Sequence, residues 1–158
     1  MQTTDALLRL AMLNTAYASA IDADRLEDWP GFFTEDCLYR ITTAENHQRG
    51  LQAGVIYADS RAMLHDRVFA LRRANIYERQ RYRHVIGMPA ILEQDADGFR
   101  AEAPFLVVRT MRAGAMEVFA AGRYLDAVRP GRDGTLHFAR REVICDSANF
   151  DTLLAIPL

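Results

Sequence analysis

The sequence predicts an α+β fold in which a curved, mainly antiparallel mixed sheet wraps around N-terminal helices to form a cone. Apolar residues recur at helical spacing in the first third of the chain, and from Arg81 onward they alternate as in strands. Tight-turn signals separate three long strands, which must curve to bury one face. Helices followed by strands are typical of the α+β class, and we expect residues 1–158 to form a single domain.

The predicted helices come first. The residues that share one face of the first helix, at spacings of three and four, are Leu10, Leu13, Tyr17 and Ile21. Asp24 with Glu27 three residues later resembles a capping box, which predicts a second, short helix. Pro30 and Gly31 are expected to end that helix.

A strand and a third helix follow. Cys37 to Thr42 alternates as a strand does, and the polar stretch from Thr43 to Gly54 predicts a loop. Asp59 and Ser60 are good caps for a helix of about fourteen residues. Its expected apolar stripe consists of Leu64, Val68 and Leu71.

The second half of the chain predicts a sheet. A strand beginning at Arg81 has one face made of Tyr82, His84, Ile86 and Met88. Asp97-Gly98 is a hairpin signal. Three long strands then form an antiparallel meander over Phe99–Arg112, Met116–Val128 and Thr135–Cys145. Gly122, in the middle of the second of these, predicts a bend or a bulge.

The composition excludes several classes of function. The net charge of −2 and the pI near 6.1 do not favour binding to nucleic acid or to an anionic membrane. No apolar run approaches the roughly 20 residues that span a bilayer, and no basic run precedes the first helix as in a signal peptide. We expect a cytoplasmic protein in which Cys37 and Cys145 are buried free thiols, with the two strand ends that carry them as candidate neighbours.

Motifs that hold metals or cofactors are absent from the sequence. A Rieske cluster needs two cysteines and two histidines at close spacing, whereas Cys37 and Cys145 are far apart and neither has a histidine nearby. A mononuclear iron site needs two histidines and a carboxylate on one face. The scattered histidines are His47, His65, His84 and His137. We therefore expect no catalytic, cofactor-binding or metal-binding residue on this chain.

His84 is the strongest candidate for chemistry of the chain's own. A pocket between sheet and helices would contain this histidine, and Asp22 at the end of the first helix would pair with it as an acid–base couple. Tyr39 is a candidate phenol of the same pocket. The alternative is a hydrogen-bonded structural histidine, with Tyr39 as an ordinary core aromatic residue.

Two other features are candidates for a subunit interface. Arg79, Arg81 and Arg83 lie on the strand face opposite His84, where like charges repel unless acidic groups meet them. They indicate either a salt-bridged interface or a solvated face. The apolar segment from Leu153 to Leu158 should dock on its own domain or on a neighbour, because an exposed apolar tail is costly.

Several motifs together resemble one family. They are Ile21-Asp22, Trp29-Pro30, Phe32-Phe33-Thr34, Asp36-Cys37, Ala58-Asp59-Ser60, Ala70-Leu71-Arg72, Ala74 to Arg79, Arg81 to His84, Tyr124-Leu125-Asp126 and Cys145-Asp146-Ser147. On these residues the chain resembles the β (small) subunits of aromatic-ring-hydroxylating dioxygenases over nearly its whole length. The block from Asn75 to His84 is the most specific, and the departures lie mainly in the turns around Gln94–Arg100 and Arg129–Asp133.

The resemblance implies a cone like that of nuclear transport factor 2 and the SnoaL-like proteins. It implies a partner, the α subunit, in an α3β3 hetero-hexamer, with a Rieske [2Fe-2S] cluster and a mononuclear Fe(II) on that subunit. A reductase component would deliver electrons from NAD(P)H, and both atoms of dioxygen would enter the ring as a cis-dihydrodiol. The implied substrate is terephthalate, with salicylate, phthalate and aminobenzoates left open.

A second function class also fits the cone. Stand-alone dehydratases and isomerases, similar to scytalone dehydratase or ketosteroid isomerase, use a pocket histidine or aspartate as acid and base, here His84 with Asp22. A third reading is a non-catalytic domain that binds a ligand or dimerises. The first reading predicts that the isolated chain binds no iron and needs a larger chain for activity, whereas the second predicts activity without a partner.

Overall fold

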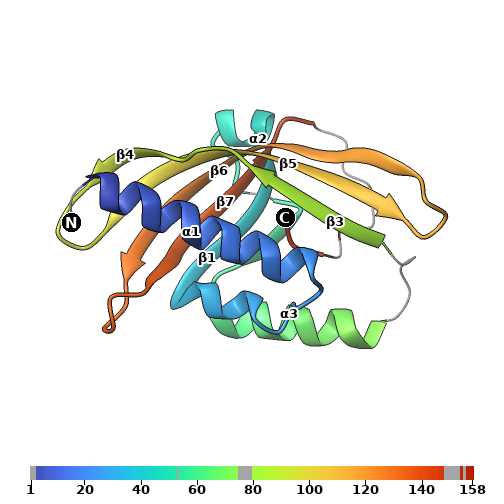
Figure 1. Cartoon of the computed structure of the whole chain (residues 1–158), viewed down its shortest axis with the longest axis horizontal. Coiled ribbons are helices and arrows are strands. Elements are labelled where there is room, and N and C mark those ends of the chain that lie inside the picture. Colours follow the sequence, from blue (N-terminus) through green and yellow to red (C-terminus); the bar gives the residue numbers. More distant parts are fainter. Residues whose placement is uncertain (1–2, 53, 75–79, 148–153, 155) are drawn as a thin grey trace.

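A curved seven-stranded sheet forms the wall of a cone, and α1 (Thr3–Asp22) lies across its concave side (Figure 1). The computed structural model describes residues 3–52, 54–74, 80–147, 154 and 156–158. The other helices are a 3-10 helix (Trp29–Phe32), α2 (Ala44–Gln48) and α3 (Arg61–Ala74). The strands are β1 (Phe33–Thr43), β2 (Ile56–Ala58), β3 (Gln80–Ile86), β4 (Ala90–Gln94), β5 (Phe99–Met111), β6 (Met116–Pro130) and β7 (Leu136–Cys145).

The sheet has the order β2-β1-β7-β6-β5-β3, and β4 pairs with β5 beside the end of β3. β5, β6 and β7 form the predicted antiparallel meander. The inward side chains of β5 are buried, as their alternation predicts, and they are Phe99, Ala101, Ala103, Phe105 and Val107. The expected cone of sheet and N-terminal helices is therefore confirmed.

The face of α1 that packs against the sheet is the predicted one. Leu10, Tyr17 and Ile21 are buried, and Leu13 packs partly buried against the same core. Residues three and four positions apart share one side of a helix, so this stripe contacts the sheet along its length. Asn14 lies on the same buried side, which places one amide inside the core.

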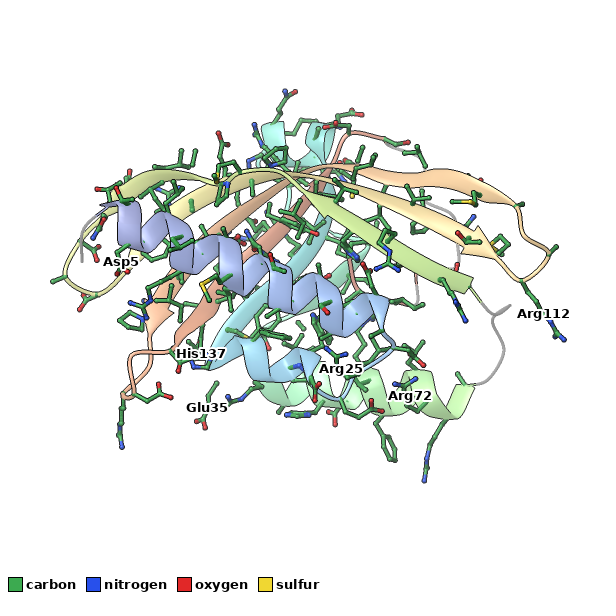
Figure 2. The ribbon with its side chains drawn as sticks, in the orientation of Figure 1. Asp5, Arg25, Glu35, Arg72, Arg112 and His137 are labelled. Carbon is green, nitrogen blue, oxygen red and sulfur yellow. The ribbon has the colours of Figure 1, made fainter. Side chains whose placement is uncertain are left out.

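The segment after α1 differs from the prediction. Asp24 and Glu27 do not cap a helix, because residues 23–28 form turns and only the 3-10 helix Trp29–Phe32 follows, with Pro30 inside it. Arg72 of α3 instead binds both carboxylates, at 2.9 Å from its Nη1 to the Asp24 Oδ1 and 2.7 Å from its Nε to the Glu27 Oε1. Figure 2 places Arg72 on α3 close to the turn that carries Arg25. The two carboxylates therefore bind a guanidinium group that is distant in sequence, and they do not cap a local helix.

The middle of the chain contains one helix more than predicted. α2 lies inside the predicted loop, and the Thr43 side chain accepts a hydrogen bond from a backbone N–H of its first turn at 3.1 Å. α3 has the predicted length and cap, because the Ser60 hydroxyl accepts a backbone N–H of α3 at 3.3 Å. Leu64 and Val68 are its buried residues.

Gly122 is required by close packing and is not a bulge. Its pairing with Phe105 on one side and Cys145 on the other is regular. A Cβ at Gly122 would lie 1.9 Å from the carbonyl oxygen of Ile144, so only glycine fits. The bulge of β6 toward β5 falls instead between the pairs Val107–Ala120 and Val108–Val118.

The two cysteines are buried and unpaired, as predicted, but they are not neighbours. β1 and β7 are parallel, and Cys145 pairs with Thr43 at the far end of β1 from Cys37. In a parallel pair the starts of both strands lie together, whereas the expectation placed a strand start beside a strand end. Burial raises the pKa of the Cys37 thiol to about 11 and that of Cys145 to about 12, so both stay protonated near neutral pH.

Candidate functional site

The interior of the cone brings His84 and Asp22 together, as the sequence predicts. β3 points His84 inward, and α1 ends at Asp22, whose Oδ1 lies 2.6 Å from the His84 Nδ1. The backbone N–H of His84 donates to the other carboxylate oxygen at 2.9 Å. Both side chains are almost fully buried. The carboxylate therefore holds the backbone and the ring of the histidine in one orientation.

The other ring nitrogen of this pair has no partner among the described residues. The His84 Nε2 is buried and makes no hydrogen bond there. A general base needs its free nitrogen within hydrogen-bonding reach of a substrate. The side chains of His84 and Asp22 are 0% and 6% exposed, and neither lines the groove beside α3 or the hollow beside the end of β3. His84 and Asp22 therefore contact each other, and the surrounding chain buries both side chains.

Tyr39 belongs to a different cluster from the one predicted. Its hydroxyl donates to the main-chain oxygen of Leu158 at 3.1 Å, and the Tyr17 hydroxyl donates to the same oxygen at 2.6 Å. Within the described residues no hydrogen bond joins Tyr39 to His84 or Asp22. The three residues of the predicted pocket therefore separate into a His84–Asp22 couple and a tyrosine pair that binds Leu158.

A buried ion pair that the sequence did not reveal lies deeper in the cone. Arg141 of β7 binds Asp126 of β6 through two parallel contacts, Nε to Oδ1 at 2.9 Å and Nη2 to Oδ2 at 2.8 Å. The Asn14 carbonyl oxygen accepts from the same guanidinium. Rings of Tyr17, Tyr124 and Phe138 surround it at 4.4, 4.1 and 3.8 Å. Burial raises the pKa of Asp126, and the Arg141 charge opposes that rise.

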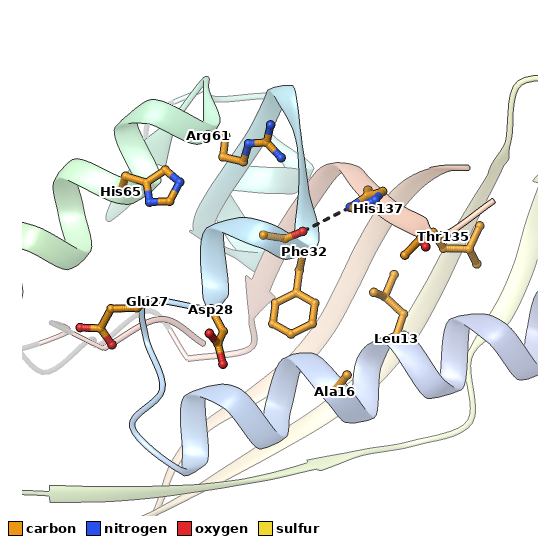
Figure 3. A pocket seen from close by; sticks show the side chains of 11 residues that line it. Leu13, Ala16, Glu27, Asp28, Phe32, Arg61, His65, Thr135 and His137 are labelled. Atoms are coloured by element: carbon orange, nitrogen blue, oxygen red, sulfur yellow. Dashed lines mark hydrogen bonds between the residues drawn. The ribbon is translucent and has the colours of Figure 1, made fainter. Parts of the chain in front are cut away.

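A surface groove of about 580 Å³ opens between α1, the 3-10 helix, α3 and the start of β7 (Figure 3). Its apolar floor includes Leu13 and Phe32, and His65 and His137 lie on its walls. The His137 ring lies 3.2 Å from the Gly31 carbonyl oxygen. The sequence carried no signal for this groove, because its lining comes from four segments that only the fold unites.

The predicted interface arginines have exposed positions where the structure describes them. Arg81 and Arg83 lie on the outer face of β3, opposite His84, and neither has an ion pair within the described residues. Arg79 and Leu153 lie outside the described residues. Leu158 is fully buried in its own chain, which is one of the two docking modes predicted for the apolar segment.

No group of three histidine, cysteine, aspartate or glutamate side chains that would hold a metal occurs in the part of the chain that the structure describes. The same residues therefore provide no ligand set for a Rieske cluster or a mononuclear iron. In these ranges no helix has both the length and the apolar composition needed to span a bilayer.

Comparison with known proteins places this geometry in context. The family model for the ring-hydroxylating β subunit matches residues 16–152. The chain is 51% identical to subunit β 1 of the terminal oxygenase component of terephthalate 1,2-dioxygenase from Comamonas sp., over 96% of this chain and 97% of that protein. It is 43% identical to the small subunit of anthranilate 1,2-dioxygenase from Burkholderia cepacia, over 93% of this chain and 91% of that protein.

A solved structure agrees with these sequence comparisons. The chain assigned as the β subunit of an aromatic-ring-hydroxylating dioxygenase from Novosphingobium aromaticivorans superimposes with a TM-score of 0.90. It is 40% identical in sequence, and the match covers 98% of both chains. The similarity therefore extends over the helices, the whole sheet and the cone interior.

Proposed function

The chain belongs to the family of ring-hydroxylating dioxygenase β subunits, and on this premise we propose that it is a non-catalytic scaffold for a larger α subunit. Family membership makes it part of an oxidoreductase complex. The observation that carries the proposal is the sequence similarity over nearly the full length of β subunits from known oxygenases. The His84–Asp22 couple supports a structural role for these side chains, because both are buried and the carboxylate binds the ring and the backbone N–H of the histidine.

The substrate of the complex is proposed to be terephthalate. The relative described above at 51% identity is named for terephthalate and the one at 43% for anthranilate, an aminobenzoate. Both are aromatic acids, so an aminobenzoate is the first alternative, followed by phthalate and salicylate. The reaction would add both atoms of dioxygen to the ring and give a cis-dihydrodiol, with electrons from NAD(P)H delivered by a reductase component.

The cofactors are proposed to reside on the α subunit. The Rieske [2Fe-2S] cluster and the mononuclear Fe(II) both need close sets of histidine, cysteine or carboxylate ligands. The described part of this chain offers no such set. Three α and three β subunits would form the oxygenase component, with each β subunit supporting the α subunits without contacting the reacting atoms.

The outer face of β3 and its neighbours is the proposed contact with the α subunit. Arg83 pairs with Val108 of β5, which pairs in turn with Val118 of β6, and Val85 is 56% and Val118 64% exposed. Arg81 lies on the same face two residues earlier in β3. Neither arginine has an ion pair within the described residues, and exposed apolar side chains beside such arginines are typical of protein interfaces, where acidic groups of a partner meet the guanidinium groups.

Co-expression with the α subunit tests this function. We expect native mass spectrometry to detect three copies of each subunit, and we expect dioxygenation of terephthalate only by the complex supplied with reductase and NAD(P)H.

Arg81→Glu with Arg83→Glu should weaken assembly by at least roughly tenfold, since each reversed charge would repel an acidic partner. The matched control is Arg129→Glu with Arg132→Glu, at exposed positions near the β6–β7 turn. Turnover of an aromatic acid by the isolated chain would contradict the proposal.

A further inference from the structure

The groove between α1, the 3-10 helix, α3 and the start of β7 has two chemically different sides (Figure 3). The side formed by α3 carries Arg61 and His65, which are four residues apart and therefore lie on the same face of that helix. The side formed by α1 carries Leu13 and Ala16, and the Phe32 ring lies beside them. The volume of about 580 Å³ lies within the range of roughly 300–1,000 Å³ that is typical of small-molecule sites. The lining therefore suits a molecule with one charged end and one apolar body.

The charged side chains of the groove differ in how firmly the chain itself holds them. Glu27 accepts from Arg72 at 2.7 and 2.9 Å, so its charge is already paired. Within the described residues, His65 makes no hydrogen bond or ion pair. Arg61 contacts Glu35 at 2.9 Å, but the Glu35 side chain is 89% exposed, and an ion pair with so exposed an acid is weak. An anion in the groove would therefore find His65 available and could replace Glu35 at Arg61.

Arg61 and His65 favour a carboxylate over other polar groups. A guanidinium matches the two oxygens of a carboxylate, and an imidazole has an N–H donor whether it is neutral or protonated. The Arg61 Nη1 donates to the Phe33 main-chain oxygen at 3.3 Å, which fixes the guanidinium at the groove before a ligand arrives. Hydrogen bonds to a charged group are stronger than those between neutral groups. The carboxylate of a ligand is therefore expected on the α3 side.

The rest of the ligand must be apolar and free of a second negative charge. A carboxylate at the far end would lie against Leu13 and Ala16, and an ionised group next to apolar side chains loses hydration without gaining a partner. Asp28 also lines the groove and would repel such a group. An aromatic ring suits this side, since it would pack against the Phe32 ring.

We propose that the groove binds an aromatic monocarboxylate, with its carboxylate on Arg61 and His65 and its ring on the apolar side. The site consists of residues of this chain alone, and it forms without an α subunit. It therefore goes beyond the scaffold function, and failure of either proposal leaves the other standing. The ligand also differs from terephthalate, which carries a second carboxylate.

A titration of the full chain, followed by nuclear magnetic resonance, tests the proposal with three matched probes. Para-toluate should shift the signals of the His65 and Phe32 rings in a saturable way, with a dissociation constant of roughly 1 mM, as expected for so small a ligand in an open site. Para-toluamide, which has a similar shape and no charge, should bind at least about tenfold more weakly. Terephthalate, in which a carboxylate replaces the methyl group, should also bind at least about tenfold more weakly.

Substitutions on the α3 side should weaken binding. Arg61→Met and His65→Leu should each lower the affinity for para-toluate at least roughly fivefold, since each removes hydrogen bonds to a charged group. The matched control is Arg49→Met, because Arg49 also has an exposed ion pair, with Glu45 at 3.5 Å, and does not line the groove. It should leave the affinity unchanged. His65 is exposed, so His65→Leu keeps the test valid if Arg61→Met destabilises the fold.

Ala16→Lys should narrow the difference between the two acids. Ala16 is exposed on the α1 side, where an ammonium group would meet the second carboxylate of terephthalate. We expect terephthalate to bind this variant about two- to fivefold more tightly than the parent chain, as for an exposed ion pair. Ala16→Gln, which adds a polar side chain without a charge, should show no such gain. A gain in affinity cannot result from misfolding.

Three results would overturn the inference. One is the absence of a saturable shift from para-toluate at concentrations well above the expected dissociation constant. Another is equal binding of para-toluate and para-toluamide. The third is an unchanged affinity in His65→Leu. If that variant also failed to co-purify with the α subunit, the groove would be a contact with another protein and not a small-molecule site.

Discussion

The inner face of the sheet and the outer face of β3 differ in how their charged side chains are paired. On the inner face, Arg141 meets Asp126 through two contacts and His84 meets Asp22. On the outer face of β3, Arg81 and Arg83 have no ionic partner among the described residues and lie next to exposed valines. Within the described residues, the chain therefore pairs these interior charges by itself and leaves the two arginines on the outer face of β3 without an ionic partner.

This difference in charge pairing assigns the interior charges to folding stability and the exposed arginines to association with another protein. A buried charge must be paired within the chain, because an unpaired charge in the interior costs several kcal/mol. An exposed charge carries no such cost and is available to another protein. Substitutions inside the cone should therefore change unfolding, and substitutions on the outer face should change assembly.

The largest expected effect is on the buried ion pair. Asp126→Leu should lower the free energy of unfolding by about 3–5 kcal/mol, because it leaves Arg141 charged and unpaired inside the cone. Urea denaturation of the purified chain measures this loss. Asp126→Leu combined with Arg141→Met should recover most of it, since the charge is then removed as well. Equal losses in the single and double variants would break the comparison.

A smaller loss is expected at the couple between α1 and β3. Asp22→Asn keeps the shape of the side chain but weakens the contacts to the His84 ring and backbone, so we expect a loss of about 1–3 kcal/mol. Asp5→Asn, at an exposed acid in the first turn of α1, is the matched control and should change stability by no more than about 0.5 kcal/mol. A result in which both changes are equally mild would show that the couple contributes nothing to folding.

The contact between Arg72 and Glu27 should give a pH-dependent effect that is smaller still. The hydrogen bond from Arg72 lowers the pKa of Glu27 to about 2. Because the folded value lies below the unfolded one, the contribution is present above the unfolded pKa of about 4.3 and is lost as the pH falls toward 2. The Glu27 side chain is 63% exposed, so the stability difference between the protein and Glu27→Gln should be below about 1 kcal/mol at pH 7. Thermal unfolding between pH 7 and pH 2 measures it, and a difference that grows on acidification would contradict the assignment.

The smallest effect on folding is expected on the outer face. Arg81→Ala with Arg83→Ala should change the stability of the isolated chain by no more than about 0.5 kcal/mol, because neither side chain has an ionic partner within the described residues. The same variant should assemble less with the α subunit in co-purification. A large loss of stability without loss of assembly would show that these arginines stabilise the fold and do not bind the α subunit.

How far the sequence predicts the site depends on whether the contacts follow a regular period. Strand alternation predicts that His84 points inward. The apolar face of the first helix is predicted by its spacing, and Asp22 lies at the end of that helix. Arg141 was not predicted as a core residue. A register shift between Ala127 and Val128, opposite Phe138 and Arg140, moves the next inward position of β7 to Arg141. One additional residue in a strand moves every later side chain to the opposite face of the sheet. Simple alternation therefore could not identify Arg141 as an inward residue.

The sequence by itself determined the helical face of α1, the alternation of β5 and the turns of the meander, because each depends on residues a few positions apart. Only the tertiary structure decided which distant groups meet. It paired Arg72 with Asp24, joined β1 to β7 in parallel, and inserted Leu158 between two tyrosines. Such contacts form where separate elements pack together, and the free energy of burial selects among partners that no local pattern distinguishes.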